Sequence, residues 1–149
     1  MDLSLIELRV GTDIPYDHLI ALYDSVGWKS YTVSERRPDL PRALRNSTHV
    51  VTAWYGDQMI GLARGLSDDV SVFYLQDVLV LPAYQGQGIG KRLVRNCIDR
   101  FSHVRLHILL TDDEDRQMHF YESLGYRNVH DLTDTPMNAF VRIQGVELA

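Results

Sequence analysis

VLPAYQGQGIGKRL (residues 80–93) decides the fold, because it joins a β-prone run to a helical run through a loop with three glycines. Residues 70–81 are rich in β-branched and aromatic side chains, and apolar residues recur at helical spacing over residues 89–98. Glycines permit positive φ angles, and the first turn of a helix presents unpaired N–H groups with partial positive charge. The order of strand, glycine loop and helix therefore predicts a cradle for an anion.

Spacing excludes two common phosphate loops. A Walker loop places a glycine five residues before its Gly-Lys-Ser/Thr, but Gln85 stands five residues before Gly90, and Arg92 follows Lys91. A dinucleotide fingerprint needs a third glycine three residues after its second, and counting from Gly88 that position is Lys91. The loop therefore binds its anion in some other way, or it only turns the chain.

The rest of the chain alternates strands and helices around this loop. Strands are expected at residues 3–10, 48–55, 59–66, 70–81, 104–110 and 138–143. Helices are expected at residues 15–26, 88–101 and 113–125. Strands that first pair as neighbours, and then alternate with helices, predict an α+β sandwich. Its mixed, mostly antiparallel central sheet is flanked by helices, with one βαβ crossover that carries the glycine loop.

Composition limits the domain organisation and the partners. The length of 149 residues suits one domain over residues 1–149, and the formal net charge of −5 disfavours nucleic acid as a partner. Cys97 is the single cysteine, so no internal disulfide forms, and the helical pattern predicts that its thiol is buried and inert. No run reaches transmembrane length, and the first residues lack the features of a signal peptide. A cytoplasmic protein without a membrane partner is expected.

The residues QGQGIG (85–90) fit the Gln/Arg-x-x-Gly-x-Gly/Ala motif of the GCN5-related N-acetyltransferases, in which this loop holds the pyrophosphate of coenzyme A. FYESLGY (120–126) resembles the second signature of the same family. The resemblance covers residues 48–130 well and the N-terminal third only by the order of its elements. It implies that the ligand of the glycine loop is acetyl-CoA, acting as a co-substrate.

The resemblance also implies roles for individual residues. The main chain of Val78, Leu79 and Val80 would bond the acetyl carbonyl and the pantetheine amides. The residues expected around the pyrophosphate are Gln85, Gly86, Gln87, Gly88, Ile89, Gly90 and Lys91. Glu114 stands where many members carry an asparagine that contacts the pantetheine arm. Tyr121 stands at the position of the general acid that protonates the departing thiolate.

The acceptor side and the general base are less defined by the residues. The expected lining of the acceptor pocket is Trp28, Tyr31, Tyr74 and Gln76, the last two on the sheet face of Val78. An alkylamine must lose a proton before it attacks, because its pKa lies near 10.4. Asp77 adjoins the thioester segment but points to the opposite face by alternation, and the acidic residues 111–115 are a second source of negative charge. The base therefore stays open.

These features predict an acetyl-CoA-dependent N-acetyltransferase that acts on a primary amine of a small molecule or a peptide. The alternatives are a non-catalytic acyl-CoA-binding or regulatory module of the same fold, and an enzyme that acetylates a protein N-terminus or lysine. A homodimer is possible. No metal site is expected, since His103 and His107 lie in a strand-like run without a third ligand at metal spacing.

Overall fold

A mostly antiparallel sheet organises the N-terminal part of the chain. The computed structural model describes residues 1–28, 32, 33, 35 and 37–149, and these fall into two units, Met1–Leu110 and Thr111–Ala149. The first unit holds a five-stranded sheet of β1 (Ile6–Val10), β2 (His49–Tyr55), β3 (Gln58–Ser67), β4 (Val72–Val80) and β5 (Leu106–Leu109), in that spatial order. Neighbours from β1 to β4 run antiparallel, and β5 runs parallel to β4. The predicted α+β class is confirmed.

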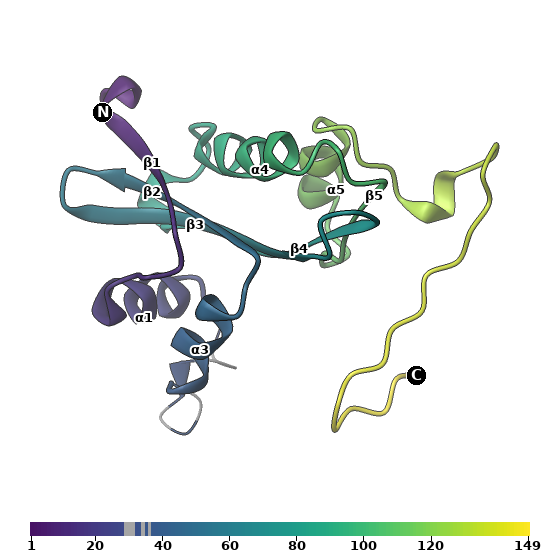
Figure 1. Cartoon of the computed structure of the whole chain (residues 1–149), viewed down its shortest axis with the longest axis horizontal. Coiled ribbons are helices and arrows are strands. Elements are labelled where there is room, and N and C mark those ends of the chain that lie inside the picture. The colour runs from purple at the N-terminus through teal and green to yellow at the C-terminus, as the bar shows by residue number, and fades with distance from the viewer. Residues whose placement is uncertain (29–31, 34, 36) are drawn as a thin grey trace. The chain divides into compact units, whose positions relative to one another are not determined.

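Helices cover both faces of this sheet. On one face lie α1 (Tyr16–Ser25) and α3 (Asp39–Arg45), and on the other lies α4 (Ile89–Arg100) (Figure 1). Because α4 connects β4 to the parallel β5, it forms the predicted βαβ crossover. The glycine loop therefore lies between β4 and α4, as the sequence predicts, and follows the short 3-10 helix η2 (Pro82–Tyr84).

The two faces pack differently. Under α1 and α3, a cluster of buried aliphatic and aromatic side chains includes Leu22, Leu44, Leu62 and Leu79. On the other face, Gly61 lets α4 approach β3 closely, because a Cβ atom there would lie 3.0 Å from Leu93 Cδ1 and 3.1 Å from the carbonyl oxygen of Leu79. The start of α4, which carries the glycine loop, is thus held tightly against the sheet.

The second unit contains α5 (Asp115–Glu122) and the 3-10 helix η3 (Val129–Asp131). Residues 132–149, all of which are described, form no strand, so the predicted last strand at residues 138–143 is wrong. Alternation of apolar residues is a local signal, whereas a strand needs a hydrogen-bonding partner, and residues 111–149 contain no other strand. Phe140 of this segment is 93% exposed.

The start of the chain also departs from the prediction. A 3-10 helix, η1 (Leu3–Leu5), precedes β1, because the Asp2 carboxylate accepts a hydrogen bond of 3.0 Å from the Ser4 N–H and caps the turn. None of the helices in the described part of the chain has the length and apolar composition needed to cross a membrane.

Candidate active site

The second half of β4 has a free edge. On one side, β4 pairs with β3 along its whole length, from Phe73 to Val80. On the other side, the pairing with β5 ends at Leu75, so the part of the sheet that is described leaves Gln76–Val80 without a neighbour there. The Leu81 N–H donates to the Ile60 carbonyl of β3 at 2.8 Å. Because main-chain groups alternate along a strand, those of Val78 and Val80 point to the free edge.

A β-bulge in β4 interrupts this alternation. Arg64 pairs with Asp77, but the next residue of β3, Gly65, pairs with Leu75, so Gln76 is the extra residue. The bulge reverses which side chains face which helices. Tyr74 pairs with Leu66 and lies on the face of Asp77, so the expectation that Tyr74 shares the face of Val78 is wrong. Alternation read from the sequence assumes an uninterrupted strand and cannot show an extra residue.

The glycine loop is open toward solvent and leads into an uncapped helix. Gly86 and Gly88 adopt φ angles of 78° and 82°, and a Cβ atom built at either residue would meet nothing within 4 Å. Gly88 is the N-cap residue of α4, and no side chain caps this end. The first bond of the helix runs from the Arg92 N–H to the Gly88 carbonyl, at 3.1 Å. The N–H groups of residues 89–91 are therefore available to a ligand, with the positive end of the helix dipole behind them.

Side chains fix this loop to the sheet. Gln85 Nε2 donates to the carbonyl oxygen of Val80 at 2.9 Å, which ties the loop to the free edge of β4. The Tyr84 hydroxyl donates to Gln58 Oε1 at 3.0 Å, at the start of β3. Ile89 is buried, with 2% of its surface exposed, so only its main chain can serve a ligand. The predicted pyrophosphate residues thus include one side chain that holds the loop and one that belongs to the core.

A buried polar cluster lies on the other face of β4. Asp77 Oδ2 accepts hydrogen bonds from Arg64 Nε at 2.6 Å and from the Tyr23 hydroxyl at 2.9 Å, and all three residues are buried. Burial alone lowers the pKa of Arg64, but the Asp77 carboxylate and the Tyr23 hydroxyl outweigh it, so the net shift is upward. Burial, and then the Asp77 charge, raise the pKa of Tyr23 well above its usual value.

This cluster bears on the search for a general base. The Asp77 carboxylate is 5% exposed and is paired with a guanidinium, so it has no access to an incoming amine. It is a structural anion rather than a base. Sequence reasoning missed Arg64 altogether, although a lone cation within the apolar run of residues 59–66 signals a buried partner, since an unpaired charge in a core is costly.

The predicted acceptor residues are only partly brought together. Trp28 is 37% exposed, and its ring contacts Tyr23 edge-on at a centroid distance of 5.9 Å. Tyr74 lies on the same face of the sheet, where burial, followed by the Asp77 charge, raises the pKa of its phenol. Gln76 is the exposed residue of the bulge. Tyr31 lies outside the described residues. Trp28 and Tyr74 are therefore linked through the neighbours Tyr23 and Asp77.

Tyr121 belongs to α5 in the second unit. Its ring contacts those of Phe120 and Tyr126 at centroid distances of 4.9 and 6.0 Å. Burial raises the pKa of the Tyr121 phenol to about 12, so the group is protonated at neutral pH. Glu114 is the exposed N-cap residue of α5, and its side chain makes no capping hydrogen bond.

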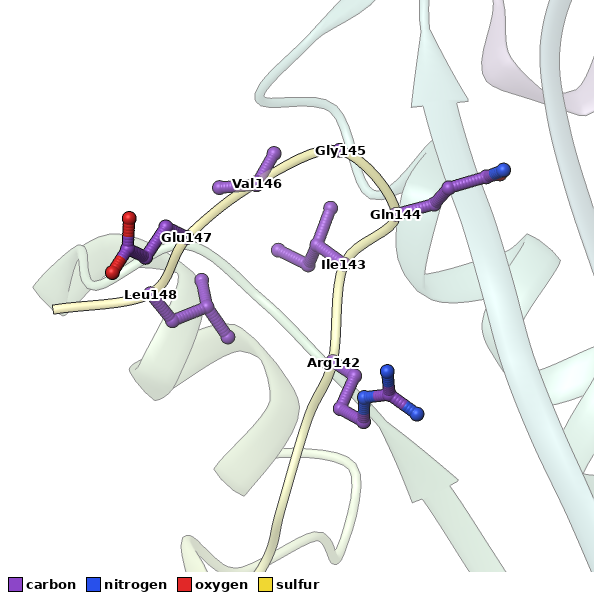
Figure 2. Close-up of a pocket in the computed structure, with 7 residues that line it drawn as sticks. All are labelled: Arg142, Ile143, Gln144, Gly145, Val146, Glu147 and Leu148. Carbon is purple, nitrogen blue, oxygen red and sulfur yellow. The ribbon is translucent and has the colours of Figure 1, made fainter.

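The two histidines that lie four residues apart have structural partners. His103 Nε2 lies 2.6 Å from Asp69 Oδ1, and His107 Nε2 lies 2.9 Å from the carbonyl oxygen of Phe101. The C-terminal segment forms a surface hollow of its own, lined by residues 142–148 (Figure 2). All of these lining residues are exposed, and none was predicted to bind a ligand or to take part in catalysis. Neither feature carries the chemistry expected from the glycine loop.

Comparisons with known proteins agree with this geometry. The sequence model of the acetyltransferase (GNAT) family matches residues 14–126. A GNAT family acetyltransferase from Streptococcus pneumoniae TIGR4 superposes with a TM-score of 0.77 at 29% identity, covering 94% of this chain and 98% of that chain.

Two plant relatives match at the level of sequence. The histone acetyltransferase TAP1 of Glycine max is 32% identical over 127 residues, which cover 78% of this chain and 53% of that protein. The GCN5-related N-acetyltransferase 2, chloroplastic, of Arabidopsis thaliana is 32% identical over 138 residues, which cover 78% of this chain and 51% of that protein. The chain thus spans about half the length of these curated relatives.

Proposed function

Because the chain is a member of the acetyltransferase (GNAT) family, we propose that it transfers an acetyl group from acetyl-CoA to a primary amine of a small molecule or a peptide. The observation that carries this proposal is the pairing of two features on one connection. The free edge of β4 ends at Val80, and eight residues later Gly88 opens an uncapped helix. A long substrate with amides at one end and phosphates at the other fits this sequence of donors.

The residues present suit such a substrate. The main chains of Val78 and Val80 are proposed to bond the acetyl carbonyl and the pantetheine amides along the free edge, with Leu79 turned toward β3 between them. The loop residues proposed to surround the pyrophosphate are Gly86, Gln87, Gly88, Ile89, Gly90 and Lys91, with Gln85 holding the loop in place. The space in front of Gly86 and Gly88 supports this assignment, since no side chain fills it. Glu114 is proposed near the pantetheine arm on the basis of its position in the family.

The proposed chemistry is direct transfer. The amine nitrogen attacks the thioester carbon, so a C–N bond forms while the C–S bond breaks. The Val78 N–H is proposed to stabilise the charge that develops on the carbonyl oxygen, which is the effect of an oxyanion hole. Tyr121 is proposed to donate its proton to the departing thiolate. Its protonation at neutral pH and its place in the FYESLGY motif support this role, whereas the group that deprotonates the amine is not assigned.

Acceptor residues are proposed on the α1 face. Trp28 and Tyr74 are partly exposed aromatic side chains beside a buried carboxylate, and Gln76 and Tyr31 are proposed with them. Aromatic faces attract cations and stack on planar groups. A protonated amine carried by a small molecule or a peptide suits such a lining, and the net charge of −5 favours it further.

Two other functions remain in competition. One is an acyl-CoA-binding module without turnover, which the missing general base favours. The other is acetylation of a protein N-terminus or lysine, which the name of the histone acetyltransferase relative favours.

One experiment separates the three functions. CoA release is measured with acetyl-CoA and a panel of polyamines, arylalkylamines, amino acids, aminoglycosides and peptides. We expect release with one class of small amines or peptides. Release only with protein substrates would favour the second alternative, and acetyl-CoA binding without release would favour the first.

The two units are proposed to act as one acetyltransferase domain, 1–149, since the family match at residues 14–126 crosses their boundary. We propose the cytoplasm as the location, on the basis of the single buried cysteine. The chloroplastic relative makes fractionation the direct check. A homodimer is proposed as the assembly, to be tested by light scattering, and neither nucleic acid nor membrane is proposed as a partner.

A further inference from the structure

The buried polar cluster of Arg64, Asp77 and Tyr23 lies beside the bulge of β4. Arg64 and Asp77 face each other in the last regular pair before the register shift that leaves Gln76 unpaired. Their side-chain atoms lie 2.6 Å apart, and the side chains are 5% and 6% exposed. Val78, whose main chain points to the free edge, is the next residue after Asp77.

The cluster joins β4 to three other elements. The Tyr23 hydroxyl belongs to α1, and Arg64 belongs to β3. Arg64 Nη1 also donates to Ser47 Oγ at 3.2 Å, and the Ser47 hydroxyl donates to the Ala43 carbonyl of α3 at 2.8 Å. A continuous chain of hydrogen bonds therefore crosses the sheet face under α1 and α3 and ends on the residue before Val78.

The position of the bulge needs such a fixed point. The segment Gln76–Val80 has a strand neighbour on one side only, so the extra residue could move along β4 with little loss of main-chain hydrogen bonds. A shift of one residue turns every following side chain to the other face of the sheet. It would take the Asp77 carboxylate away from Arg64 and leave the guanidinium unpaired in the core, which is strongly unfavourable.

We propose that Arg64, Asp77 and Tyr23 are positioning residues that lock the bulge at Gln76 and thereby aim the Val78 N–H at the acetyl carbonyl. This inference rests on the proposed function and extends it to three residues that contact no substrate. It assigns the ion pair to register rather than to stability. A well-packed apolar pair can replace a buried ion pair without loss of stability, but it cannot distinguish one register from the next.

The test is the double variant Arg64→Met/Asp77→Leu, compared with the wild type. Both proteins are followed by amide chemical shifts in ¹⁵N-labelled samples, by titration with CoA and by steady-state kinetics. Thr52→Val is the matched control, because it removes another buried side-chain hydrogen bond, from Trp54 Nε1 to Thr52 Oγ1 at 2.8 Å on β2. If the double variant does not fold, Tyr23→Phe takes its place, since it keeps the ion pair and removes one bond to Asp77.

We expect the double variant to retain CoA-induced shifts at Gly86, Gly88 and Gly90, with a dissociation constant within about threefold of the wild type. Its Val78 amide should move, and its kcat should fall by about tenfold or more because an oxyanion donor is displaced. Tyr23→Phe should show the same pattern with a smaller fall in kcat. The control Thr52→Val should lose stability without a change at Val78 or in kcat.

An unchanged Val78 amide and an unchanged kcat in a folded double variant, or in Tyr23→Phe when that variant takes its place, would overturn the positioning role. Failure of the proposed function has a different signature, because CoA would then leave the glycine amides of the wild type unshifted. In that case the Val78 amide of the variants still decides whether the cluster locks the bulge.

Discussion

Replacing Gly88 by glutamate tests the anion cradle directly. Gly88 has a φ angle of 82° at the N-cap of α4, and a Cβ atom there meets no other atom within 4 Å. The substitution therefore causes no clash, and its structural cost is the left-handed backbone alone, about 1–2 kcal/mol. We expect the protein to fold with that loss of stability and to bind CoA very weakly.

The loss of affinity has two contributions. A carboxylate about 4 Å from a phosphate charge costs about 1 kcal/mol in water and about 4 kcal/mol at the lower effective dielectric of a protein surface. Each main-chain or dipole contact that the phosphates lose costs roughly a further 0.3–2 kcal/mol. Together they predict at least about 3 kcal/mol, which is a rise in Kd of roughly 100-fold or more.

Gly27→Glu is the matched control. Gly27 has a φ angle of 77° and also meets nothing within 4 Å, but it follows α1 on the opposite side of the sheet from α4. Calorimetric titration with CoA and urea unfolding are measured on both variants. Similar losses of stability with a loss of affinity only in Gly88→Glu would support the cradle. A folded Gly88→Glu that binds CoA as the wild type does would refute it.

Three further predictions concern single residues. Tyr121→Phe should lower kcat much more than acetyl-CoA affinity, and because burial raises the pKa of Tyr121 to about 12, the wild-type kcat should show no fall from this group until the pH approaches that value; equal losses of kcat and affinity would instead indicate packing. Cys97, whose pKa burial raises from 9.0 to about 12, should react with a disulfide reagent at pH 8 only when urea unfolds the chain, and its ionisation should reduce stability as the pH rises from 9.0 to about 12, because the unfolded thiol ionises first. Gly65→Ala should lower the urea midpoint by an amount equivalent to about 1–3 kcal/mol, since its Cβ atom would lie 2.6 Å from Phe73 Cε1 and 2.7 Å from the Tyr74 carbonyl oxygen; an unchanged midpoint would show that Phe73 moves freely.

The sequence predicts those parts of the fold that local patterns specify. The hairpin of β2 and β3, the meander into β4 and the helix after the glycine loop all follow from periodicity and turn residues. The glycine loop is also local, since its φ angles and the helix N-terminus depend on a few consecutive residues. These elements include the whole of the proposed phosphate site in the first unit.

The parts that the sequence does not predict depend on contacts between distant residues. The bulge at Gln76 exists only relative to β3, so alternation within β4 placed Tyr74 on the wrong face. The pairing of Arg64 with Asp77 joins residues 13 positions apart, and each looked ordinary or ambiguous alone. Residues 138–143 show the opposite failure, because a good strand pattern without a partner strand stayed irregular.

The division of work along β4 follows from its two kinds of atoms. Its main chain at Val78 and Val80 points to the free edge, whereas its side chains at Asp77 and Leu79 are buried toward α1. A ligand that uses the main chain is insensitive to most side-chain changes at residues 78 and 80, provided that the strand keeps its register. The register in turn depends on a side chain that no ligand touches. The most consequential substitutions in β4 should therefore be at Asp77, whose carboxylate lies on the far face of the sheet from α4.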